Sequence, residues 1–198
     1  TSWEAVKNPE VAPHTVLTDI SNGYGMLSFL MLNKVSGGDL DNIQPGLDAV
    51  SDILENGAVI ISTSPEIQQE FAQNDAWLAP YASDYAFTLK KAGLPAGFVL
   101  AEEGVPAVFI TANLVANRPN QELALKFIDK TIAADAQACM AEALRYVPTN
   151  SKVELSAEAA ADVPHGEDAV KGLIRFDPTV IEANRSDWVD RWNRTIAR

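Results

Sequence analysis

The strongest constraint on the fold of this chain is an alternation of short apolar runs with helical patterns over residues 15–100. The expected strands are the runs TVLT at residues 15–18, AVII at 58–61 and AWLA at 76–79. The run at 58–61 is continuously apolar, which is typical of a strand covered on both faces. Strands that alternate with helices in this way predict an α/β lobe with a largely parallel sheet.

Polar side chains follow each expected strand, and they are the candidate ligand-binding residues. Open α/β sheets bind small ligands beyond the carboxyl ends of their strands, so these side chains should share one edge. The candidates are Asp19, Ser21 and Asn22 after the first strand, Ser62, Thr63 and Ser64 after the second, and Tyr81, Ser83, Asp84 and Tyr85 after the third.

Each of these groups also has a purely structural interpretation. Asp and Asn commonly cap helices, so Asp19, Ser21 and Asn22 either contact a ligand or cap the helix expected over residues 24–35. The hydroxyls before Pro65 either bind a carboxylate or phosphate at a helix start, or Ser64 is a plain cap.

The third group combines aromatic rings with a carboxylate. Phe87 is assigned to the core of the helix that follows, and the same alternative exists for Tyr85, with Asp84 as a cap. Tyr81 and Asp84 are instead assigned to a ligand, since an aromatic face and a carboxylate both attract an ammonium group.

Composition argues against several classes of function. The chain has 15 basic and 27 acidic side chains, a formal charge of −12, which disfavours binding to nucleic acid or to an anionic membrane. Its one cysteine, Cys139, excludes a Cys-based zinc cluster and is expected to be buried in a helix over residues 134–144. The histidines, His14 and His165, do not stand at metal-binding spacing, and no catalytic motif is present. We therefore expect no catalytic residues, no metal and no cofactor.

Five runs of sequence, in order, carry a resemblance that covers nearly the whole chain: APYASDYA, KKAGLPAGFVLAEEGVPA, NQELALKFID, RYVPTN and ANRSDWVDRWNRTI. They resemble the periplasmic solute-binding proteins of ABC importers, in particular the spermidine/putrescine-binding type. The resemblance implies a type II two-lobe α/β fold, a permease as partner, a periplasmic location and a signal peptide in the precursor. An enzyme or a regulatory ligand-sensing domain on the same fold is the alternative.

The resemblance also predicts how the chain is divided. Residues 1–109 would form the second lobe, largely complete, and residues 110–198 the hinge crossing and the C-terminal helical part of the first lobe. The first half of that lobe would be absent, so the chain is expected to be a fragment. Apolar faces of the helix over residues 120–132 and of a final helix capped by Ser186, with Trp188 and Trp192, would then favour self-association.

The same comparison adds Phe109 and Thr111, at the crossover, to the candidate ligand contacts. The acids and tryptophans of the polyamine type are replaced at Ile20, Gly23, Ala82, Phe109 and Thr111. The resemblance therefore implies a small amine or amino acid, such as a γ-aminobutyrate-like compound, with a polyamine as the alternative.

Overall fold

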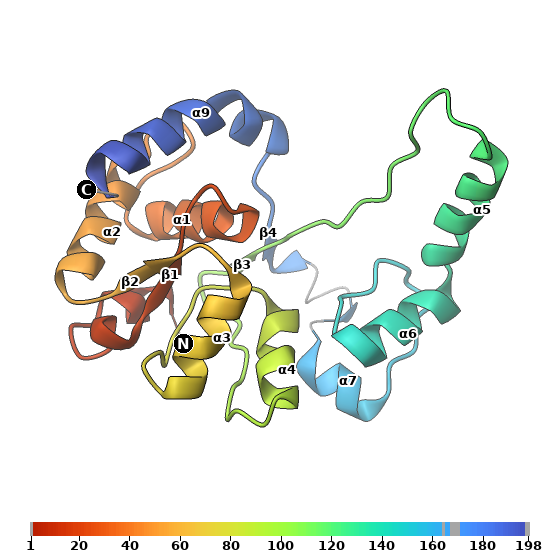
Figure 1. The fold of residues 1–198 in the computed structure, drawn as a ribbon, viewed down its shortest axis with the longest axis horizontal. Coiled ribbons are helices and arrows are strands. Elements are labelled where there is room, and N and C mark those ends of the chain that lie inside the picture. The colour runs from red at the N-terminus through yellow and green to blue at the C-terminus, as the bar shows by residue number, and fades with distance from the viewer. Residues whose placement is uncertain (1, 164, 167–170, 197–198) are drawn as a thin grey trace. The chain divides into compact units, whose positions relative to one another are not determined.

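The computed structural model describes residues 2–163, 165–166 and 171–196 (Figure 1). The chain divides into two compact units. Unit 1 consists of Thr1–Ala82, Val99–Ala107 and Leu173–Arg198, and unit 2 of Ser83–Phe98 and Val108–Gly172. The chain therefore passes between the units at 82/83, 98/99, 107/108 and 172/173.

Unit 1 is built on short parallel strands, as the alternating pattern predicted. Strand β1 (Val16–Thr18) pairs with β2 (Val59–Ile61) in the register Leu17 to Ile60. The expected third strand is reduced to a bridge between Leu78 and Thr15, also parallel. A second small parallel sheet joins β3 (Val105–Pro106) to β4 (Leu173–Ile174).

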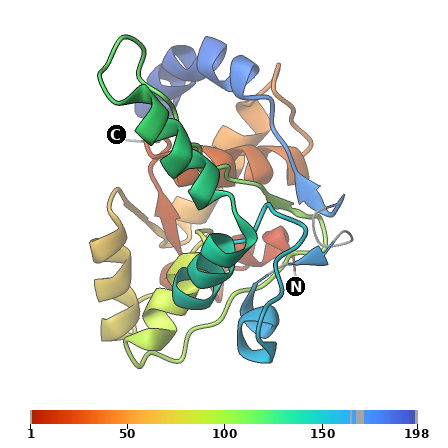
Figure 2. The same ribbon diagram turned by 90° about the vertical axis from the view of Figure 1, so that its right-hand side faces the viewer.

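Helices α1 (Gly23–Val35), α2 (Gln44–Glu55) and α9 (Pro178–Thr195) enclose the core of unit 1 (Figures 1 and 2). Helix α1 is buried on nearly all sides, because its sequence has almost no polar face. Helix α2 buries the stripe Leu47, Val50 and Ile53, spaced for one helical face, and the chain leaves it at Gly57, whose φ is +102°. The remaining elements of unit 1 are α3 (Ser64–Gln73) and the 3-10 turns η1 (Trp3–Lys7) and η2 (Ala12–His14).

Unit 2 contains the helices α4 (Ser83–Lys91), α5 (Gln121–Thr131), α6 (Ala134–Leu144) and α7 (Ala157–Asp162). Arg145 is its main buried charge. The guanidinium lies 4.2 Å from the centre of the Phe87 ring and forms ion pairs with Glu158 (2.8 Å) and Asp162 (3.2 Å). It therefore links α4, α6 and α7.

Three local predictions are wrong. Strand β2 is not covered on both faces, since Val59 is 45% exposed. Cys139 of α6 is exposed, whereas Ala141 of the same helix is buried. Ser186 does not cap the final helix, because α9 begins two turns earlier, where the Asp177 side chain accepts a hydrogen bond from the Thr179 N–H.

The C-terminal helix also differs from expectation in its surroundings. Trp188 and Trp192 are buried in unit 1, and the Trp192 ring meets Phe29 edge-on at 5.5 Å. In contrast, α5 has no buried residue among those described, and Leu123 and Phe127 are each 67% exposed. By contacts, α4 belongs to unit 2 and α9 to unit 1, and the division into lobes at residues 1–109 and 110–198 stays a prediction.

Candidate functional site

Three chain segments leave the parallel strands of unit 1 at the same edge. The turn after β1 begins at Asp19, whose N–H donates to the carbonyl of Ile61 at the end of β2 (3.1 Å). The segment after Leu78 is held by the Ser28 hydroxyl of α1, which donates to the carbonyl of Pro80 (3.0 Å). The predicted convergence of polar side chains at one edge is therefore present for the part of the set that lies in unit 1.

The turn after β1 uses its polar side chains within the fold. The Asp19 carboxylate accepts hydrogen bonds from the Ser21 N–H (2.8 Å) and hydroxyl (2.5 Å), and from the Trp192 indole N–H (3.2 Å). Asn22 caps α1, since its side-chain oxygen accepts from the Tyr24 N–H (2.8 Å). These bonds support the capping interpretation for Asn22 and give Asp19 a fixed orientation.

In the turn after β2, the predicted capping residue is wrong. Thr63, not Ser64, is the N-cap of α3, and it forms a capping box with Glu66. The Glu66 carboxylate accepts from the N–H (3.2 Å) and hydroxyl (2.8 Å) of Thr63. The Glu66 carboxylate thus already places a negative charge at the start of α3, where the sequence predicted that a carboxylate or phosphate could bind. Ser62 is exposed.

Ser64 does not cap α3, and its side chain forms a hydrogen bond with Tyr81 instead. Its hydroxyl lies 2.6 Å from the phenol oxygen of Tyr81. The Tyr81 ring in turn lies 5.0 Å from that of Tyr24, centre to centre, with the planes tilted by 52°. Sequence reasoning assigned Tyr24 only to a helix. Its place in the first turn of α1, just after a predicted ligand turn, was the signal that could have identified it.

The remaining predicted residues belong to unit 2. Ser83, Asp84 and Tyr85 form the first turn of α4, and Asp84 lines a cavity of about 350 Å³ together with Phe87 and Tyr146. Burial raises the pKa of the Asp84 carboxyl, although the N–H groups of Asp84 and Tyr85 act in the opposite direction. Among the described residues no Lys or Arg forms an ion pair with Asp84.

Phe109 and Thr111 follow the 107/108 passage into unit 2 and are exposed. The Phe109 side chain is 58% exposed, and the Thr111 hydroxyl accepts from the Asn113 amide (3.2 Å). Their contact with a ligand remains a prediction.

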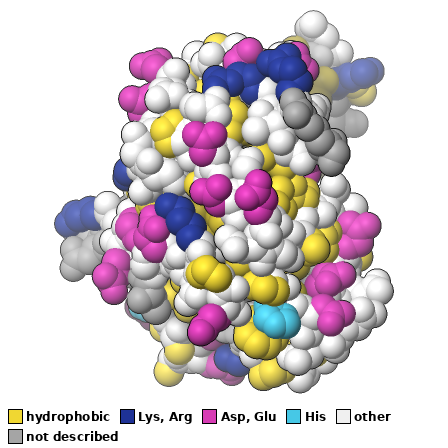
Figure 3. Space-filling model, turned by 90° about the vertical axis from the view of Figure 1, so that its left-hand side faces the viewer, with side chains coloured by type: hydrophobic (Ala, Val, Ile, Leu, Met, Phe, Trp, Pro, Cys, Tyr) yellow, Lys and Arg dark blue, Asp and Glu magenta, His cyan; other side chains and the backbone are white. Residues whose placement is uncertain are grey.

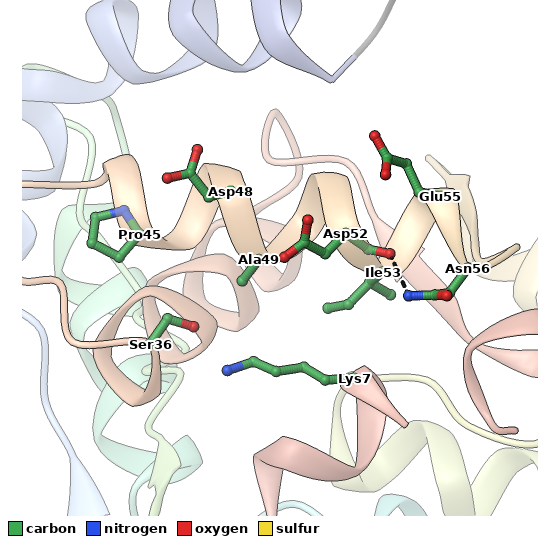
Figure 4. Close-up of a pocket in the computed structure, with 9 residues that line it drawn as sticks. All are labelled: Lys7, Ser36, Pro45, Asp48, Ala49, Asp52, Ile53, Glu55 and Asn56. Carbon is green, nitrogen blue, oxygen red and sulfur yellow. Dashed lines mark hydrogen bonds between the residues drawn. The ribbon is translucent and has the colours of Figure 1, made fainter. Parts of the chain in front are cut away.

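A larger cavity of about 770 Å³ lies elsewhere in unit 1, against α2 and η1 (Figure 4). Asp48, Asp52 and Glu55 of α2 and Lys7 of η1 line it, and Lys7 forms an ion pair with Glu4 (2.9 Å). Ser36, the C-cap of α1, also lines this cavity. The strand-end site lies at the amino end of α1. A helix of 13 residues is about 20 Å long, so the two ends of α1 are about that far apart. The cavity is therefore separate from the candidate site.

Negative charge characterises the surface around unit 1. Figure 3 shows acidic side chains distributed over the face that it presents, with basic side chains in fewer places. This agrees with the formal charge of −12. An acidic field attracts cationic solutes and repels anionic ones.

Metal-binding clusters and membrane-spanning helices are not found in the described part of the chain. No group of three or more His, Cys, Asp or Glu side chains there could hold a metal ion. His14 stacks on Trp77 (3.7 Å between ring centres), and His165 bonds to the carbonyl of Val163 (2.8 Å). Within residues 2–163, 165–166 and 171–196, every helix is too short or too polar to traverse a lipid bilayer.

Solved structures share this fold. An ABC transporter protein from Clostridium perfringens ATCC 13124 matches with a TM-score of 0.82 and 26% identity, over 99% of this chain and 62% of the other. The binding protein AgtB from A. tumefaciens R10, in complex with agropinic acid, matches with a TM-score of 0.71 and 19% identity, over 100% and 63%. A GABA receptor matches with a TM-score of 0.68 and 18% identity, over 96% and 60%.

The chain spans about three fifths of the length of these structures. A search of curated proteins found no match. The model of the family described as bacterial extracellular solute-binding protein matches residues 1–165, which is most of the sequence. The resemblance noted in the sequence is confirmed at this level, and the chain belongs to the bacterial extracellular solute-binding protein family.

Proposed function

We propose that the protein is the substrate-binding component of an ABC importer, and that it captures a small amine-bearing solute in the periplasm for delivery to a permease. The observation that carries the proposal is the strand-end edge of unit 1. There the rings of Tyr24 and Tyr81 meet, and the turns carry the carboxylates of Asp19 and Glu66. Aromatic faces and carboxylates both favour a cationic group.

Asp84 supports the same class of solute from unit 2. Its ionised form is disfavoured by burial, so it gains from the arrival of an ammonium group more than an exposed carboxylate would. We propose that Ser83, Tyr85, Phe109 and Thr111, which all belong to unit 2, also contact the solute.

Within this class, we favour an amino acid such as a γ-aminobutyrate-like compound over a polyamine. Ile20, at a position where the resemblance places a polyamine-binding acid, is 0% exposed and belongs to the core. One structurally similar protein is described as a GABA receptor, which supports a solute with both amine and carboxylate groups.

Isothermal titration calorimetry tests the proposal. We expect γ-aminobutyrate or putrescine to bind, and glucose and sulfate not to bind. Asp84→Asn should weaken amine binding about tenfold or more, as expected for loss of a charged partner, and should leave thermal stability unchanged or higher because a disfavoured buried charge is removed. Binding of sugars or oxyanions alone would contradict the amine assignment.

A further inference from the structure

The phenol of Tyr81 is held by a side chain from another segment. Ser64 Oγ and Tyr81 Oη are 2.6 Å apart, at the short end of the range for O–H···O hydrogen bonds. A tyrosine side chain has two main torsions, so a bond at its oxygen, together with packing at its ring, fixes the tilt of the ring. The Ser64 hydroxyl is not used to cap α3, because Thr63 is the N-cap of that helix.

The ring of Tyr24 completes a corner with that of Tyr81. The two ring centres lie 5.0 Å apart with a tilt of 52°, within the range of favourable aromatic pairs. Tyr24 is fixed at the start of α1, where its N–H donates to the capping side chain of Asn22. Both tyrosines are partly exposed, so their rings are neither core residues nor fully solvated.

Two carboxylates belong to the chain segments that carry this corner. Asp19 and Glu66 are the carboxylates on its turns, and in the described part of the chain neither forms an ion pair with Lys or Arg. The faces of the two rings carry negative potential as well. A positively charged group is therefore the one that this edge stabilises.

We propose that Tyr24 and Tyr81 form an aromatic corner that receives the ammonium group of the solute, and that Ser64 is a positioning residue that acts through Tyr81. This inference rests on the proposed function and assigns the amine end of the solute to unit 1. It adds Tyr24 to the ligand contacts and gives Ser64 an indirect role.

Titration of γ-aminobutyrate and putrescine into variants tests both parts. Tyr24→Leu should weaken binding about 2- to 30-fold, while Tyr24→Phe, which keeps the aromatic face, should stay within about twofold of the wild type. Ser64→Ala and Tyr81→Phe should each weaken binding, and the double variant should be no weaker than Tyr81→Phe alone. Ser51→Ala is the matched control, because it removes a hydroxyl on α2 that donates to the Leu47 carbonyl (3.0 Å) and should leave affinity unchanged.

Fluorine NMR of the chain labelled with 3-fluorotyrosine gives a readout that needs no ligand. Ser64→Ala should move the resonance of Tyr81, identified by its loss in Tyr81→Phe, and should leave that of Tyr146 in place, while Ser64→Thr should restore it. An unmoved Tyr81 resonance, or additive effects of Ser64→Ala and Tyr81→Phe on affinity, would overturn the positioning role. Equal affinities of Tyr24→Leu and the wild type would overturn the aromatic corner.

These outcomes separate the inference from the proposed function. If the wild-type chain binds neither amine, the proposed function and the ammonium assignment both fall, and the fluorine spectrum still decides whether Ser64 orients Tyr81. If the amines bind and the variants behave as the wild type, only the further inference falls.

Discussion

Arg145 connects three helices of unit 2. Its side chain is 3% exposed and contacts the Phe87 ring and the carboxylates of Glu158 and Asp162. Its backbone has a φ of +59° at the end of α6. Arg145→Met should lower the free energy of unfolding by about 2 kcal/mol, less than for a fully buried pair because Glu158 is mostly exposed and rehydrates. Urea unfolding followed by circular dichroism measures this, and an unchanged midpoint would contradict it.

The same cluster predicts a dependence of stability on pH. Hydrogen bonds from Arg145, and then from Lys90, hold the pKa of Asp162 below its ordinary value of 3.8. The folded state thus binds the proton more weakly, so the stabilisation is complete above that value and is lost as the pH falls through the lower, folded-state pKa. Unfolding curves between about pH 5 and pH 2 should therefore lose stability less steeply for Asp162→Asn than for the wild type.

The sequence could predict that Tyr81 and Ser64 leave the sheet at one edge, but not what each one bonds to. Tyr81 and Ser64 follow strands, and strand ends share an edge, so their convergence follows from topology. Whether Thr63 or Ser64 caps α3 depends on backbone angles that either residue can adopt. The bond from Ser64 to Tyr81 spans 17 positions and depends on strand register, which a local pattern does not contain.

At the scale of elements, α1 can pack closely against the strand-end turn because Gly25 has no side chain. A Cβ atom at Gly25 would lie 2.1 Å from the carbonyl oxygen of Asp19 and 2.6 Å from that of Thr18. Gly25→Ala should thus displace the start of α1 and cost about 1–3 kcal/mol of stability. Gly23→Ala is the matched control, since nothing lies within 4 Å of a Cβ there. Equal thermal midpoints for the two variants would contradict this close approach.

The helices α5 and α6 were predictable to within a residue at each end. The burial of other elements was not, because burial depends on neighbours that are distant in sequence. Val59 of β2 is apolar but 45% exposed. The helix α9 begins earlier than expected because Asp177 and Pro178 together supply a cap and a first helical residue.

At the scale of the whole molecule, the apolar surface of unit 2 predicts self-association. Leu123 and Phe127 on α5, and Val108 to Ile110 before it, are all about half exposed or more. Light scattering should show species larger than the monomer at micromolar concentration, and Leu123→Glu with Phe127→Glu should shift them toward the monomer. Lys126→Glu on the same helix changes the charge equally but removes no apolar surface, so it should have little effect. A monomeric wild-type chain would contradict the prediction.

The core of unit 1 also determines when that unit can fold during synthesis. Val6 and Ala12 near the amino end share one hydrophobic cluster with Trp188 and Trp192 near the carboxyl end. A ribosome makes the amino end first, and domains usually fold as they emerge. Here the cluster lacks two of its largest side chains until α9 has been synthesised. Nascent chains arrested before α9 should therefore remain protease-sensitive in unit 1, and chains arrested after α9 should be protected.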